Sequence, residues 1–218
     1  MVRLPNNRQR ITIVGRTGSG KTVAAVWHLS LRDIDKRPWV IIDYKCDELI
    51  NSIEKAQHVD VGFVPGKKDT GIFIAHPVPE QDDDKVNEWL WKLWARENVG
   101  VYADEGYMVA GCPAYNTLLT QGRSKNIPMI TLSQRPVWIS RFCFSEADFF
   151  QVFDLIDRRD QKTVESFIPV SLEHSLPDFH SYYFDVGKKK LTVFKPVPSG
   201  ESILKTIDSK LTKSRRKV

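Results

Sequence analysis

Eight consecutive residues near the N-terminus have the types and spacing of a phosphate-binding loop. They are Gly15, Arg16, Thr17, Gly18, Ser19, Gly20, Lys21 and Thr22, and they follow the apolar run 11–14. The run fits the strand, glycine-rich loop and helix pattern GxxxxGK[ST] (Walker A), in which backbone N–H groups and a helix N-terminus surround phosphates. Lys21 would reach the outer phosphates, and the Thr22 hydroxyl is placed to bind Mg²⁺. We therefore predict a site for ATP and Mg²⁺.

A second run, at 99–105, ends in two acids, Asp104 and Glu105 (the Walker B position). The carboxyl ends of parallel strands are where α/β folds place ligands, so this pair is expected to meet the phosphates. Asp104 would hold Mg²⁺ through its water shell, and Glu105 would orient or deprotonate the attacking water. The alternative is a pair that caps the next helix. A dedicated water-activating Glu favours an ATPase over a small-molecule kinase.

Composition is that of an ordinary globular protein, with 218 residues of which 41% are hydrophobic and 27% charged. No apolar run approaches the roughly 18 residues of a membrane span, and the first residues lack the apolar core of a signal peptide. We expect a protein that stays in a cytoplasm or reaches a particle by assembly. The three cysteines and five histidines lack the spacing of metal ligands, so no zinc site is predicted.

Charge is unevenly distributed along the chain. The formal net charge is +5, but residues 188–218 contain ten basic and only two acidic residues. A segregated basic end suggests nucleic acid or an acidic partner surface, and a solvated terminus is the alternative. We expect an ATPase domain at 1–198 and a basic C-terminal helix or tail at 199–218.

Apolar periodicity predicts alternating strands and helices, which is typical of βαβ units and a parallel sheet. Strands are expected at 10–14, 39–43, 71–75, 99–104, 128–133, 148–154, 180–185 and 190–194. Helices are expected at 21–31, 47–56, 82–96, 114–123, 158–167 and 199–211. The last two strands read as a β-hairpin. The expected fold is α/β, with a mainly parallel central sheet flanked by helices.

Two further polar residues could take part in ATP hydrolysis. Gln134 follows the strand-like run 129–133, and would lie beside the γ-phosphate and sense it. Arg123 precedes that strand by several residues, at the end of an expected helix, and could project into the site of a neighbouring subunit.

With these residues in place, the chain resembles the FtsK/HerA superfamily of DNA-pumping ATPases. It most resembles the genome-packaging ATPases of icosahedral double-stranded DNA viruses with an internal membrane. Besides the phosphate-binding loop, the resemblance is carried by the runs 40–45, 102–105, 122–124 and 133–136, and it covers roughly residues 8–195.

The resemblance implies a RecA-like P-loop fold, subunits that form a ring, commonly a hexamer, and double-stranded DNA moved without regard to sequence. It also implies capsid or vertex proteins as partners, at a packaging vertex or in the cytoplasm of an infected cell. Carried over by position, Arg123 is the arginine finger that acts in trans, with Arg135 and Arg141 as competitors, and Gln134 is the sensor. Asp43 and Lys45 match a recurrent Asp-x-Lys that either touches nucleotide or braces the sheet.

Three other functions remain open at this point. An export ATPase of filamentous phages would share the nucleotide motifs but usually adds a membrane span. A small-molecule kinase would carry an arginine-rich lid and act as a monomer, and a vertex docking protein would bind ATP with little turnover. DNA stimulation of ATP turnover separates the motor from the latter two. Basic loops that could contact DNA lie at 66–68, 158–159 and 188–190.

Overall fold

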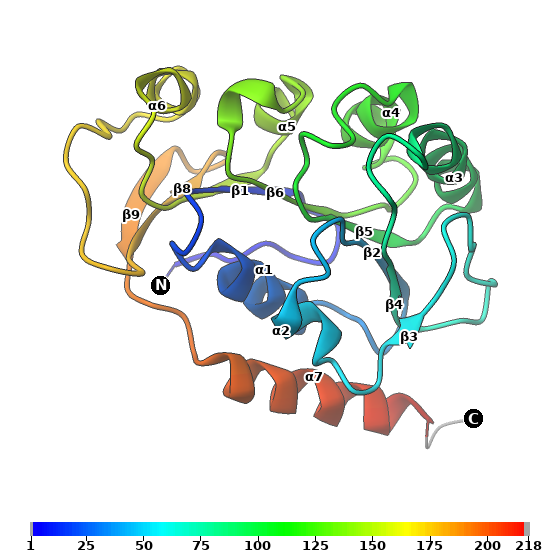
Figure 1. Ribbon diagram of the computed structural model, residues 1–218. Coiled ribbons are helices and arrows are strands. Elements are labelled where there is room, and N and C mark those ends of the chain that lie inside the picture. Colours follow the sequence, from blue (N-terminus) through cyan, green and yellow to red (C-terminus); the bar gives the residue numbers. More distant parts are fainter. Residues whose placement is uncertain (1, 216–218) are drawn as a thin grey trace.

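The described part of the chain folds around one nine-stranded sheet (Figure 1). The computed structural model describes residues 2–215. The sheet order is β3-β4-β2-β5-β6-β1-β7-β8-β9. The first seven of these strands run parallel, and β8 and β9 are antiparallel additions at one end. The strands are β1 Ile11–Val14, β2 Pro38–Ile42, β3 Gln57–His58, β4 Gly71–Ala75, β5 Gly100–Ala103, β6 Met129–Ser133, β7 Phe149–Val152, β8 Ser181–Asp185 and β9 Lys190–Phe194.

Helices cover both faces of the sheet, which is why the central strands are buried and mainly apolar. Every residue of β1, β2, β4, β5, β6 and β7 is buried, as expected for parallel strands covered on both sides. In Figure 1, α3, α4, α5 and α6 lie on one face and α1, α2 and α7 on the other. The helices are α1 Lys21–Ser30, α2 Glu48–Asn51, α3 Asp83–Arg96, α4 Pro113–Gln121, η1 Pro136–Trp138 (3₁₀), α5 Phe142–Ser145, α6 Arg158–Glu165 and α7 Gly200–Arg215.

The C-terminal helix α7 is docked on the body of the protein. Its buried side chains Ile203, Ile207 and Leu211 join the core that includes α1 and α2. Lys210 donates to the backbone oxygens of Ser30 and Arg32, at 2.5 and 3.0 Å, just where α1 ends. Part of the charge of the predicted basic tail therefore stabilises the C-terminus of a helix. Residues 216–218, the end of that tail, lie outside the described residues.

The α/β class, the parallel order and the C-terminal hairpin are confirmed, and the differences are local. The helix expected at 47–56 is one turn long, because Asp47 caps it and the chain leaves it at Ser52 to form the short strand β3. The segment between β6 and β7 contains two short helices that the periodicity did not predict. Across residues 2–215, none of the helices has the length and apolar character that a membrane crossing needs.

Candidate nucleotide site

The predicted phosphate-binding loop joins β1 to α1 and is anchored by its neighbours. The Gly15 amide donates to Ser133 O at the end of β6 (3.2 Å), and the Arg16 amide donates to Asp154 O beyond β7 (2.8 Å). Gly18 and Gly20 have φ of 77° and 96°, a region that favours glycine. Because Gly20 caps α1 without a side chain, the first N–H groups of the helix point toward the loop and favour an anion.

Lys21 begins α1 and is 5% exposed. Burial lowers the pKa of its ammonium, and the charge of Asp104 opposes that shift. The structure thus brings the lysine and the acid of the two predicted motifs into one electrostatic environment, although they are far apart in the sequence.

The two predicted acids follow β5 and are buried, with Asp104 2% and Glu105 1% exposed. Burial, helped by the charge of Asp43, raises the pKa of Asp104 to about 6. Within the described residues, Asp104 Oδ2 and Glu105 Oε2 are buried without a hydrogen-bond partner. The other oxygen of Glu105 accepts from the ammonium of Lys45. Burial of this carboxylate pair therefore lowers the stability of the fold, and its unpaired oxygens are available for a ligand.

Replacing Asp104 with Asn is expected to raise the free energy of unfolding at pH 8 by about 1–3 kcal/mol, without nucleotide or Mg²⁺. The folded-state pKa of Asp104 lies above its ordinary value, so the wild type loses stability as pH rises from about 4 through 6. The variant lacks that loss, and the two proteins should converge near pH 4. Urea unfolding at pH 4 and pH 8 measures this, with exposed Asp60→Asn as the control. A stability difference independent of pH would contradict the expectation.

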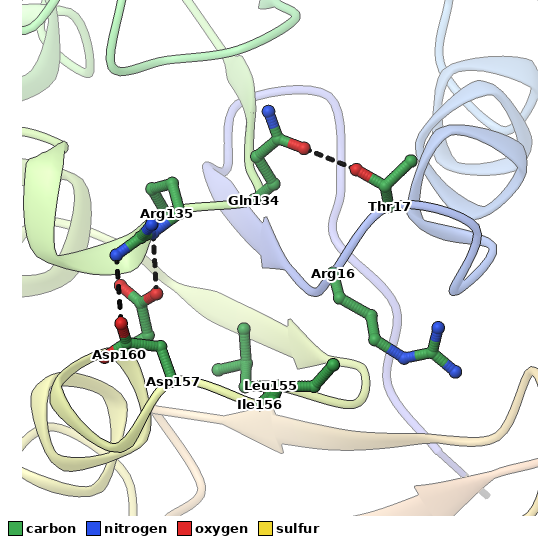
Figure 2. Close-up of a pocket in the computed structure, with 8 residues that line it drawn as sticks. All are labelled: Arg16, Thr17, Gln134, Arg135, Leu155, Ile156, Asp157 and Asp160. Atoms are coloured by element: carbon green, nitrogen blue, oxygen red, sulfur yellow. Dashed lines mark hydrogen bonds and ion pairs between the residues drawn. The ribbon is translucent and has the colours of Figure 1, made fainter.

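Gln134 reaches the phosphate-binding loop directly. The Thr17 hydroxyl donates to Gln134 Oε1 at 2.6 Å, and Figure 2 shows the two side chains pointing toward each other. The next residue, Arg135, turns away to Asp160 (2.9 Å) and Asp157 (3.2 Å). These side chains line a cavity of about 240 Å³ on one side of the loop. Gln134 is thus in contact with the loop, whereas Arg135 is held by two carboxylates.

A larger cavity of about 390 Å³ lies on the other side of the loop, under the segment 175–180. Phe179 of this segment is 56% exposed and adopts φ 58°. A Cβ at Gly20 would lie 3.1 Å from the Phe179 ring, so the ring borders the loop closely. Asp154 connects the phosphate-binding loop to the segment 175–180, because it accepts from Arg16 (2.8 Å) and from the Ser175 hydroxyl (2.7 Å).

Arg123 lies at the opposite edge of the sheet from its own phosphate-binding loop. It follows α4 and pairs with Asp148, which precedes β7, whereas the loop follows the carboxyl end of β1. Its side chain is 60% exposed. The competitor Arg141 instead lies 5.7 Å from the centroid of the Phe167 ring. Arg123 is therefore the predicted site residue that lies away from the sheet edge with the phosphate-binding loop.

Sequence reasoning missed Asp154 and Phe179. For Asp154 a signal was present, because it lies two residues beyond a buried strand that pairs with β1. Phe179 belongs to a segment without periodicity, and its place above Gly20 arises from a contact between distant parts of the chain. Nothing local in the sequence distinguishes it.

The strand β6, which Gln134 follows, lies between the strand of the phosphate-binding loop and the strand of the acid pair. This order and the loop define a P-loop nucleoside triphosphatase of mainly parallel α/β architecture. Over 218 aligned positions the chain is 50% identical to the DNA packaging ATPase P9 of Enterobacteria phage PRD1, with 95% of each chain covered. The chain therefore belongs to the family of viral DNA packaging ATPases, and the resemblance predicted from its motifs is confirmed.

Solved structures support the same fold. The genome packaging NTPase B204 of Sulfolobus turreted icosahedral virus 2, in complex with sulfate, matches with a TM-score of 0.65 at 16% identity, covering 89% of this chain and all of that one. The EccC ATPases 2 and 3 of Thermomonospora curvata match with a TM-score of 0.64 at 14% identity, over 91% of this chain and 38% of that chain. No protein-family model matches the chain.

Proposed function

We propose that this packaging ATPase is a ring-forming motor that uses ATP hydrolysis to move double-stranded DNA into a preformed capsid. Support comes from the 50% identity to a DNA packaging ATPase along 95% of the chain. Within the site, ATP hydrolysis is supported by a buried carboxylate, Glu105, which follows Asp104 in a P-loop fold. The motor would work at the packaging vertex of the virion or in the cytoplasm of the infected cell, with capsid or vertex proteins as partners.

Residues 15–22 would surround the phosphates of ATP, with Lys21 on the outer ones. Thr22 and Asp104 fit Mg²⁺, because hydroxyl and carboxylate oxygens are the ligands it prefers, and Asp104 Oδ2 is buried without a partner among the described residues. Bound Mg²⁺ would neutralise charge on the phosphates. Glu105 would orient and deprotonate the attacking water, and Gln134 would sense the γ-phosphate across from Thr17.

The nucleoside would occupy the cavity under the segment 175–180. Its volume of about 390 Å³ lies next to Gly18 and Ser19 of the loop, and the exposed Phe179 ring offers an aromatic face to a base. Stacking on an aromatic side chain tolerates different bases and stabilises a bound base.

Replacing Phe179 with Ala is therefore expected to weaken ATP binding by about 5- to 150-fold, since one stacked base contributes about 1–3 kcal/mol. The rate at saturating ATP should change little, because the phosphate contacts remain. Titration with a fluorescent ATP analogue and steady-state kinetics measure both quantities. Phe142→Ala, which removes another exposed ring, is the matched control. An unchanged affinity for ATP in Phe179→Ala would place the base elsewhere.

The position of Arg123, at the edge opposite the proposed nucleotide site, supports a ring. An interface that joins two different faces, one with the nucleotide and one with Arg123, closes into a ring when its rotation allows. A hexamer is the state we propose. In this assembly residues 1–198 form the ATPase domain, and 199–218 form the C-terminal helix and tail, whose helix lies on α1.

DNA would be held through its phosphates, without base contacts, so its binding should weaken with salt. The three basic loops lie apart: 66–68 precede β4, 188–190 follow β8, and Arg158 and Arg159 begin α6. Since β4 and β8 lie near opposite ends of the sheet, a single subunit would contact DNA at separate points.

Turnover of ATP as a function of protein concentration, with and without double-stranded DNA, tests the proposed function. A motor ring requires turnover that rises steeply with concentration and with DNA. Turnover independent of both would overturn the proposal in favour of a monomeric phosphotransferase.

A further inference from the structure

The turn after β2 is unusually well fixed, and it carries Lys45. Asp43 is fully buried, and its two carboxylate oxygens accept from the amides of Lys45 (3.1 Å) and Asp47 (2.9 Å). His76, which follows the neighbouring strand β4, lies 3.0 Å from Asp43 O through Nδ1. Asp43 therefore braces the turn and does not itself reach for a ligand.

From this turn, the Lys45 side chain extends across to the end of β5 and donates to Glu105 Oε1. The two partners differ in environment, since the Lys45 side chain is 38% exposed and that of Glu105 only 1%. Glu105 adopts φ 54°, a conformation that few residues other than glycine favour. A buried carboxylate on a strained backbone is thus fixed by one cation that reaches it from the open side of the site.

A purely structural brace is a poor explanation for this pair. The turn is already fixed by Asp43, and a buried ion pair often contributes little net stability because desolvation offsets the attraction. The ion pair also leaves Glu105 Oε2 buried without a hydrogen-bond partner among the described residues. An arrangement built for stability would satisfy both oxygens, whereas one that holds a base ready for water leaves one oxygen free.

We infer that Lys45 is a positioning residue for hydrolysis, which holds Glu105 in the orientation that receives the attacking water. This inference rests on the proposed function, because it presupposes that Glu105 activates water. The two lysines of the site then have different roles: Lys21 contacts the phosphates, and Lys45 orients the carboxylate of Glu105. Lys45 belongs to the turn after β2 and its ammonium donates to Glu105, so losing it should affect the rate and spare nucleotide binding.

Lys45→Met in the full chain is expected to lower kcat by about 10- to 100-fold, the effect typical of losing a partner that orients a functional group. The KM and the Kd for ATP should stay within about threefold of wild type. Lys45→Arg, which keeps a cation of similar reach, should recover most of the rate. Exposed Lys92→Met is the matched control and should behave as wild type. The melting temperature of each variant is measured alongside.

A double-mutant cycle with Glu105→Gln tests whether Lys45 acts through Glu105. If Lys45 acts through Glu105, adding Lys45→Met to Glu105→Gln should change the residual rate by less than about twofold, because residues that act as a unit are not additive. Independent, multiplying effects would overturn the inference, as would a wild-type kcat in Lys45→Met or a loss confined to ATP affinity. A wild-type chain without ATP turnover would instead overturn the proposed function, and the inference with it.

Discussion

Glu105→Gln is expected to reduce ATP turnover by about 10²- to 10⁴-fold, the range for losing a general base. The amide keeps the shape of the carboxylate but cannot take a proton from water. ATP binding should persist, because the phosphate-binding loop, Lys21 and Asp104 are untouched. Steady-state turnover in the presence of double-stranded DNA, combined with ATP titration, measures the two quantities. The variant should therefore bind ATP and DNA while it turns over almost no nucleotide.

The matched control for this variant is Glu88→Gln, a change on the exposed face of α3. It should leave both turnover and affinity unchanged. Turnover by Glu105→Gln at the wild-type rate would show that another group activates the water and that the acid pair has a structural role.

The sequence predicts the fold well wherever an element is long and buried. The strands from β1 to β7, apart from β3, are short apolar runs between turn residues, and their alternation with helices is sufficient to predict a parallel sheet. The sequence does not predict β3, which has two exposed residues. It also does not predict η1 and α5, which are three and four residues long. Such short pieces are decided by tertiary contacts that no local pattern encodes.

The same distinction applies to the site. Lys21, Asp104 and Gln134 could be placed near one another because each follows a strand or begins a helix at the carboxyl edge of a parallel sheet. The pairing of Lys45 with Glu105 could not be predicted, since it depends on where a flexible side chain from one turn meets the next strand. Phe179 depends on how a segment without secondary structure returns over the loop.

The position of Arg123 is informative because it excludes one role outright. The helix α4 returns the chain to the amino edge of the sheet, so Arg123 cannot act on the nucleotide bound by its own subunit. Asp148 holds its guanidinium at the surface, where 60% of the side chain remains exposed. In an interface between unlike faces, this edge of one subunit would meet the nucleotide edge of the next.

Arg123→Ala is therefore expected to lower turnover of the assembled, DNA-bound protein by about 10³- to 10⁵-fold, the range for an arginine finger. The physical reason is the loss of a cation that stabilises charge on the transferred phosphoryl group. Turnover is measured at a protein concentration where the wild type is saturated. Arg8→Ala, an exposed arginine in the turn before β1 at the same edge, serves as the control and should keep its activity.

Mixing variants distinguishes a finger in trans from a structural arginine. An Arg123→Ala subunit has an intact nucleotide site but no finger, and a Glu105→Gln subunit has a finger but no general base. In a mixed ring, the intact site of the first can receive the finger of the second, so turnover should exceed that of either variant alone. If Arg123 only paired with Asp148, mixing would restore nothing, and Asp148→Asn would lose as much activity as Arg123→Ala. Recovery on mixing, with Asp148→Asn active, is the result that a shared site between subunits requires.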